Sequence, residues 1–184
     1  SKTDLSPISV KTYSDAVEKY KGSANEENRN RLIYLAVAQI DMNFREYQRT
    51  RRIGRDSFNI LMDILELAAS TATSIVNGPR PKDVINYSLT FLQGSRSSVT
   101  KNLRLLEIQI LFNKMIEMRS NLMITILDNV KKPHADYPFE RAYLDIVAYF
   151  TAGTWDSALS ALAADTGLKA NQAEIKLERK RGIL

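Results

Sequence analysis

The 184-residue sequence contains no cysteine, which excludes disulfides, thiolate metal ligands and cysteine nucleophiles. Its only histidine is His134, so a di-metal site built from two Glu-x-x-His pairs is also excluded. No stretch approaches the roughly 20 apolar residues that a membrane-spanning helix needs. No run of alternating polar and apolar residues predicts a β-strand. These absences favour an all-helical protein and leave few ways to build an active site.

The composition is that of an ordinary folded domain. Apolar residues make up 44% of the chain, enough to bury a core without covalent cross-links. We expect one helical domain over residues 1–184, with residues 1–24 as a candidate for a loosely attached N-terminal helix. The 26 basic and 21 acidic residues give a net charge of +5, which permits association with nucleic acid or anionic lipid without requiring it.

Apolar residues recur at three- and four-residue spacing along most of the chain, which predicts helices. The expected helices span residues 8–20, 25–54, 56–77, 81–94, 95–131, 139–150, 155–165 and 170–181, with Asp56 as an N-cap and a loop over 132–138. We therefore predict an all-α bundle of about seven or eight helices. The helices 25–54 and 95–131 would be its two long antiparallel members, and the short C-terminal helices would pack across one end.

The C-terminal segment has the spacing of a helix-turn-helix. Ala163 lies four residues before Gly167, and Leu168 and Ile175 follow on a second helix. In a DNA-binding interpretation of residues 155–181, phosphate contacts come from basic residues of that helix, namely Lys176, Arg179, Lys180 and Arg181. An ordinary helical hairpin needs the same small residue and glycine, and it is the competing interpretation.

Two other groups are candidates for partner or anion binding. A basic cluster closes the second predicted helix and comprises Arg45, Arg49, Arg51, Arg52 and Arg55. It would suit a phosphate, an anionic lipid or an acidic partner, but arginines at the end of a helix also oppose its negative pole. Trp155 and the aromatic residues Tyr137, Phe139, Tyr143, Tyr149 and Phe150 would form either a partner surface or part of the core.

Catalytic signals are weak. Ser98 and Lys101 match a Ser-x-x-Lys pair, but the companion elements of such enzymes are missing. Acidic residues fall among apolar helix positions at Asp41, Asp63, Glu66 and Asp145. They would either share a cleft or bond to Arg or Tyr of neighbouring helices, because a buried charge must be paired. We expect no cofactor and no metal.

Several short motifs resemble an uncharacterised group of bacterial helical proteins, many of them predicted to be exported lipoproteins. The resemblance rests on Arg29-Asn30-Arg31, Ala38-Gln39-Ile40-Asp41, Gly94-Ser95, Tyr137-Pro138, Ala142, Leu144-Asp145, Tyr149, Ala152-Gly153-Thr154, Ala158 and Leu162. It implies a location in the bacterial envelope, periplasmic or at the outer membrane, with a lipidated cysteine upstream of Ser1. The sequence itself shows neither a signal nor a lipobox, so the cytoplasm is the alternative.

From these features we expect a non-enzymatic interaction protein of the bacterial envelope. It would belong to a multiprotein assembly such as a secretion apparatus. The alternative is a DNA-binding regulator that uses the helix-turn-helix over 155–181.

Overall fold

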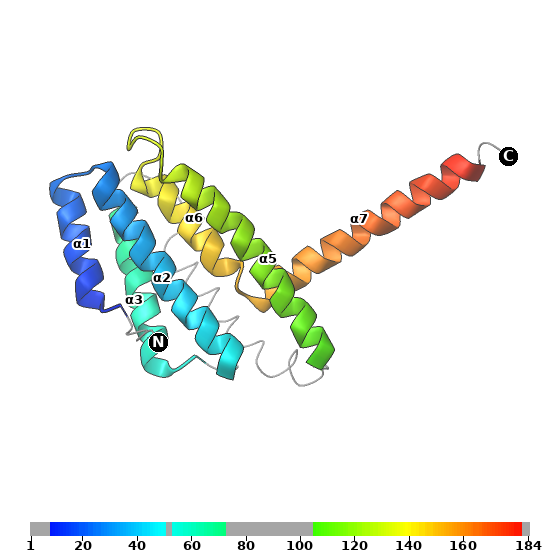
Figure 1. The fold of residues 1–184 in the computed structure, drawn as a ribbon, viewed down its shortest axis with the longest axis horizontal. Helices are drawn as coiled ribbons and strands as arrows, with labels where there is room; N and C mark the ends of the chain where they lie inside the picture. The colour runs from blue at the N-terminus through cyan, green and yellow to red at the C-terminus, as the bar shows by residue number, and fades with distance from the viewer. Residues whose placement is uncertain (1–7, 51–52, 73–104, 182–184) are drawn as a thin grey trace, which may run out of the picture.

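The structure is a computed structural model that describes residues 8–50, 53–72 and 105–181. These residues form helices and no strand, so the all-α prediction is confirmed (Figure 1). The helices are α1 (Val10–Gly22), α2 (Glu26–Thr50), α3 (Arg55–Ala72), α5 (Leu105–Asn129), α6 (Phe139–Thr151) and α7 (Trp155–Arg181). The predicted helix over 81–94 and the Ser98–Lys101 pair lie outside the described ranges.

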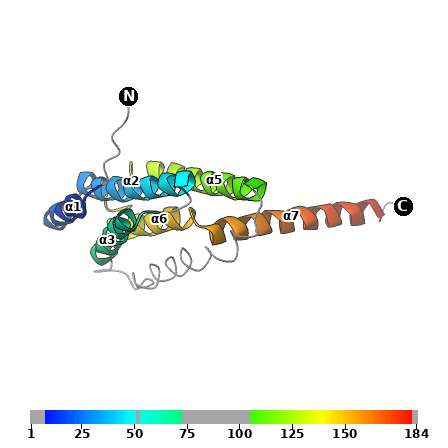
Figure 2. The same cartoon turned by 90° about the horizontal axis from the view of Figure 1, so that it is seen from below.

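The helices form two layers. Figure 2 shows α2 and α5 in one layer and α3 and α6 in the other, with α1 at one edge. Helix α6 packs against α2, α3 and α5, while α1 packs against α2 and α3. The outer face of the α2–α5 layer is therefore not covered by any other described helix.

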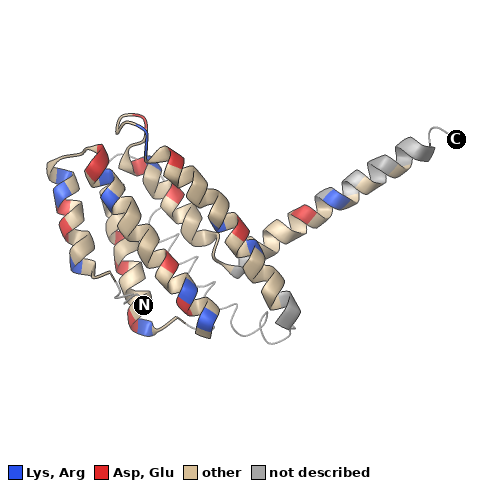
Figure 3. Ribbon diagram, viewed as in Figure 1, with Lys and Arg blue, Asp and Glu red and all other residues tan. Residues whose placement is uncertain are grey.

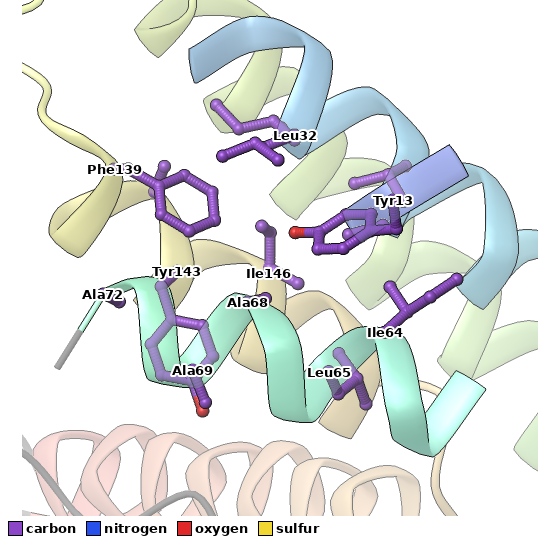
Figure 4. Close-up of a cluster of buried hydrophobic side chains, with 14 of the residues drawn as sticks. Tyr13, Leu32, Ile64, Leu65, Ala68, Ala69, Ala72, Phe139, Tyr143 and Ile146 are labelled. Atoms are coloured by element: carbon purple, nitrogen blue, oxygen red, sulfur yellow. The ribbon is translucent and has the colours of Figure 1, made fainter. Parts of the chain in front are cut away.

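The main core lies between these layers (Figure 4). Helix α1 begins with Ser9 as its N-cap and buries one stripe, including Tyr13, which is 0% exposed. Small residues on α3, such as Ala68, Ala69 and Ala72, let the neighbouring helices approach closely. Helix α6 buries the stripe that its spacing predicts: Phe139, Ala142, Tyr143, Ile146, Tyr149 and Phe150. For these aromatic residues and for Tyr137, the core interpretation is confirmed.

A buried arginine holds the loop that joins α5 to α6. Arg29 of α2 is 0% exposed and donates to the carbonyl oxygens of Val130 at 2.9 Å, Lys132 at 3.1 Å and Tyr137 at 2.7 Å. The carbonyls of Val130 and Lys132 follow the C-terminus of α5, the negative pole of that helix, so a guanidinium is favoured there. The predicted loop over 132–138 is confirmed, and Arg29 fixes its path.

The predicted helix-turn-helix is wrong. Helix α7 is continuous for 27 residues and passes through Gly167, which does not adopt the left-handed conformation that a turn would need. A glycine inside a helix costs only about 1 kcal/mol relative to alanine, and good helix formers follow Gly167 at Leu168, Lys169 and Ala170. The prediction of two short helices across one end is also wrong. Helix α7 packs on α5 near its start and then extends away from the bundle (Figure 1).

Other predicted details differ as well. The described residues form six helices, which does not match a count of seven or eight. The predicted bounds of the two long antiparallel helices, 25–54 and 95–131, are not matched either, since α2 ends at Thr50 and α5 is described only from Leu105 to Asn129. Their backbones do not pack as a close pair, because α6 lies beneath them and a groove separates them.

Helix α3 begins at Arg55, which places Asp56 in its first turn and not at the N-cap. No helix among the described residues is long and apolar enough to cross a membrane.

Candidate functional site

A groove runs between α2 and α5 on the uncovered face of their layer. Its volume is about 450 Å³. The α2 side contributes Asp41, Phe44, Arg45 and Gln48, the α5 side contributes Ile116, Arg119, Ser120, Met123 and Ile124, and Tyr149 reaches it from α6. Residue pairs across the two helices, Asp41 with Arg119 and Phe44 with Phe112, show that α2 and α5 run in opposite directions.

The groove is centred on an ion pair between the two helices. Arg119 donates to Asp41 Oδ1, and the Tyr149 hydroxyl donates to the same oxygen at 2.5 Å. The Arg119 guanidinium also lies 4.2 Å from the Phe44 ring centre and 4.3 Å from the Tyr149 ring centre. Cation–π contacts of this kind strengthen when the cation is removed from water, and the Arg119 side chain is only 7% exposed.

A close backbone approach makes room for this cation. Gly153 lies in the turn between α6 and α7, and a Cβ at this position would stand 3.2 Å from Arg119 Nη1 and 3.3 Å from the Phe44 ring. A side chain at this position would therefore require the guanidinium and the Phe44 ring to shift slightly. The turn between α6 and α7 thus helps to position Arg119 beneath the groove.

The electrostatics of these groups favour anchoring over proton transfer. Burial lowers the pKa of Arg119, while the neighbouring Tyr149 and Asp41 oppose that effect. Burial and the hydrogen bond to Asp41 raise the pKa of Tyr149, so its hydroxyl stays protonated at neutral pH. Both donors bind Oδ1 of Asp41, and the described part of the chain places no donor on Oδ2. The groove therefore presents one carboxylate oxygen that is able to accept a further hydrogen bond.

The exposed residues on the α5 side of the groove are largely apolar. On α5, Ile116 is 44% exposed, Ile124 is 59% exposed and Leu127, one turn beyond the groove, is 44% exposed. Ile116, Ser120, Met123 and Leu127 share one helix face by their spacing, and none of them is charged. Exposed apolar residues that cluster in this way mark interaction surfaces more often than scattered ones do.

Of the residues singled out in the sequence, the structure brings three to the groove, namely Asp41, Arg45 and Tyr149. Arg45 lines it, whereas Arg49 and Arg55 are exposed near the end of α2 and the start of α3 (Figure 3). Arg51 and Arg52 lie outside the described residues. Trp155 is the first residue of α7, and Lys176, Arg179, Lys180 and Arg181 lie in its last two turns. The side chains of these five residues also fall outside what the structure describes.

Sequence reasoning missed Arg119, Ile116 and Ile124. The spacing of the two isoleucines did carry information. They do not share the helix face formed by Leu122, Ile126 and Val130, so their side chains point away from the predicted buried face. Nothing in the sequence marked Arg119 as buried, since its partners come from α2 and α6.

The acidic residues give a mixed result. Asp41 pairs with Arg119 and Tyr149, and Asp145 accepts hydrogen bonds from Tyr137 at 2.6 Å and Asn129 at 3.1 Å. For Asp41, pairing with Arg and Tyr of neighbouring helices is confirmed, whereas the tyrosine that pairs with Asp145 lies in the loop between α5 and α6. Asp63 and Glu66 are instead exposed on α3. Water solvates their carboxylates there, so they need no Arg or Tyr partner. Within the described ranges, no three His, Asp or Glu side chains cluster as metal ligands would.

The sequence matches no known protein family, and neither a curated protein nor a solved structure resembles it significantly. The resemblance to exported lipoproteins therefore stays a prediction.

Proposed function

We propose that this protein is a non-enzymatic interaction protein whose α2–α5 groove receives an apolar helix face of a protein partner. The observation that carries this proposal is the row of uncharged residues on the α5 wall, where Ile116 and Ile124 are exposed beside a groove of about 450 Å³. Helix-in-groove recognition uses apolar anchors at helical spacing, and a groove between two helices suits such anchors.

The groups at the floor of the groove support binding more than catalysis. A general base or nucleophile needs a free site aimed at substrate and a pKa near the working pH. The Tyr149 hydroxyl is held by Asp41 Oδ1, and its raised pKa keeps it a donor, so it is not available as a base. These groups thus hold α2, α5 and α6 at a fixed spacing, and the free Oδ2 of Asp41 adds a polar contact that orients the partner.

The bacterial envelope is the proposed location, in an assembly such as a secretion apparatus with a lipid anchor upstream of Ser1. This part of the proposal is supported by the resemblance alone. Fractionation of cells that express the native gene tests it, and recovery only from the cytosol would contradict it.

The groove itself is tested by co-purification of the full-length native protein from its own cells. The variant Ile116→Glu places a carboxylate on the apolar wall, where its desolvation opposes burial by a partner. Ile110→Glu is the matched control, because Ile110 is 47% exposed on the same helix but lies about a third of a turn away from Ile116. We expect a defined set of partners with the wild type and with Ile110→Glu, and loss of that set with Ile116→Glu. Equal recovery with both variants would contradict the proposal.

The DNA-binding alternative loses its structural premise, because α7 is one continuous helix. Salt-sensitive binding of duplex DNA that depends on Lys176, Arg179 and Lys180 would be needed to restore it.

A further inference from the structure

The α2–α5 face has a pattern that is complementary to itself. On α5, Ile116 and Ile124 lie four residues to either side of Ser120, and Asn113 and Leu127 lie seven residues to either side. If a second copy of α5 packs antiparallel to the first with Ser120 at the crossing point, Ile116 of each copy therefore lies opposite Ile124 of the other. Serine is small enough at the crossing point to let two helices approach closely.

Helix α2 repeats this symmetry at the same level. Asp41 contacts Arg119, so Asp41 and Ser120 lie at similar heights in the layer. Tyr34 lies seven residues before Asp41 on the same helix face, and Gln48 lies seven residues after it. Ala38 lies three residues before Asp41, and Arg45 lies four residues after it. A two-fold axis that crosses both helices at this level would place small Ala38 opposite Arg45 and aromatic Tyr34 opposite Gln48.

We infer that the partner in this groove is a second copy of the chain, bound face to face about a two-fold axis that passes near Ser120 and Asp41. This inference rests on the proposed use of the α2–α5 groove. A two-fold dimer uses the same patch on both copies, so the patch must be self-complementary, as this one is.

The charges of the two copies are complementary in this arrangement. Arg45 lies four residues from Asp41, or about 6 Å along the helix, so Arg45 of one copy reaches the free Oδ2 of Asp41 in the other. The two Arg45 residues stand about 12 Å apart along the helix, beyond the screening length of physiological salt. Each Asp41 carboxylate is already bonded to its own Arg119, which limits repulsion near the axis.

The size of the face sets the expected affinity. The facing stretches of α2 and α5, about 25 Å long with their side chains and each about 10 Å wide, present roughly 500 Å² on each copy, or about 1,000 Å² in total. That is below the roughly 1,200–2,000 Å² of stable interfaces and in the range of weak, transient ones. The dimer is therefore reversible, with a dissociation constant on the order of micromolar.

Sedimentation equilibrium of the 184-residue chain over a concentration series tests the dimer. We expect a reversible dimer for the wild type and for Ile110→Glu, and at least a tenfold weaker association for Ile116→Glu. Circular dichroism of the three proteins verifies that each is folded. A wild type that stays monomeric at concentrations far above micromolar would overturn the inference.

The absence of native cysteine allows a geometric test, because an introduced thiol is the only one in the chain. A disulfide requires Cα atoms within about 7 Å, so Ser120→Cys on the axis forms a covalent dimer on mild oxidation. Asn113→Cys alone does not, since its two copies stand about 21 Å apart along the antiparallel helices. A mixture of Asn113→Cys and Leu127→Cys gives the mixed disulfide.

The outcomes separate this inference from the proposed function. Cross-linking of Asn113→Cys to itself, or none with Ser120→Cys, would overturn the antiparallel dimer. A monomeric protein that loses a different partner through Ile116→Glu would also overturn the dimer, while the groove would keep its proposed function.

Discussion

Arg119 on α5 forms an ion pair with Asp41 on α2 at the floor of the groove, and the Tyr149 hydroxyl of α6 donates to the same carboxylate oxygen. Three helices thus meet at one oxygen atom. Because this contact sets the spacing of α2 and α5, it determines the shape of the groove as well as the stability of the fold.

Replacement of Asp41 by Asn tests the importance of this contact. The change leaves the Arg119 guanidinium largely buried without its counter-charge, so we expect a loss of about 2 kcal/mol in the free energy of unfolding. Urea denaturation measures it. Asp63→Asn is the control, because Asp63 is exposed on α3 and should change stability by less than about 0.5 kcal/mol. Equal effects of the two variants would show that the ion pair does not stabilise the fold.

Stability should fall at alkaline pH. Burial raises the pKa of Tyr13, Tyr137 and Tyr149 above the ordinary value of 10.0. A tyrosine with a raised pKa in the folded state favours folding below the unfolded pKa, and this contribution is lost as the pH rises above about 10.

Tyr13 isolates the effect, because its buried hydroxyl has no hydrogen-bond partner among the described residues. Tyr13→Phe should leave stability at pH 7 unchanged or slightly higher, and it should make the alkaline loss shallower. Tyr34→Phe is the control, since Tyr34 is 48% exposed. Thermal melts between pH 7 and pH 11 provide the measurement, and identical pH profiles for the two variants would contradict the prediction.

Arg29→Lys should loosen the loop between α5 and α6. Lysine keeps the charge but lacks the planar fork with which Arg29 reaches the carbonyls of Val130, Lys132 and Tyr137. We expect a loss of about 2 kcal/mol and faster amide exchange in residues 130–138. Arg31→Lys, at an exposed site on the same helix, should change neither quantity. Unchanged exchange in Arg29→Lys would show that the loop holds its path without this contact.

Gly167→Ala distinguishes a continuous helix from a turn. A Cβ at Gly167 meets nothing within 4 Å, so alanine should stabilise α7 locally by about 0.5–1 kcal/mol and slow amide exchange around residue 167. Gly153→Ala should instead destabilise the protein, because its Cβ would crowd Arg119 and Phe44. Faster exchange after Gly167→Ala would indicate a left-handed turn.

The sequence allowed the helices that bury one stripe to be predicted well. The stripe of α6 from Phe139 to Phe150 follows directly from its spacing, as does the burial of Tyr13 and Val17 on α1. The path of α7 was predicted wrongly, because Gly167 is compatible with both a turn and the interior of a helix, and the spacing of the residues around it does not distinguish the two.

The site was largely hidden from sequence reasoning. The pairing of Asp41 was foreseen as one of two alternatives, yet its partners Arg119 and Tyr149 lie 78 and 108 residues away. Local periodicity carries no information about contacts at such separations. The groove walls were equally hidden, since Ile116 and Ile124 become informative only when α2 and α5 are placed side by side.

Site-specific photo-crosslinking in living cells tests most directly whether the α2–α5 groove is the interaction surface. A photo-reactive side chain at Ser120, within the groove, is compared with one at Thr125, which is also exposed on α5 but faces away from the groove. We predict discrete adducts from Ser120, either with a second copy or with another protein, and none of comparable yield from Thr125. Adducts of equal yield from both positions, or none from Ser120, would contradict the account.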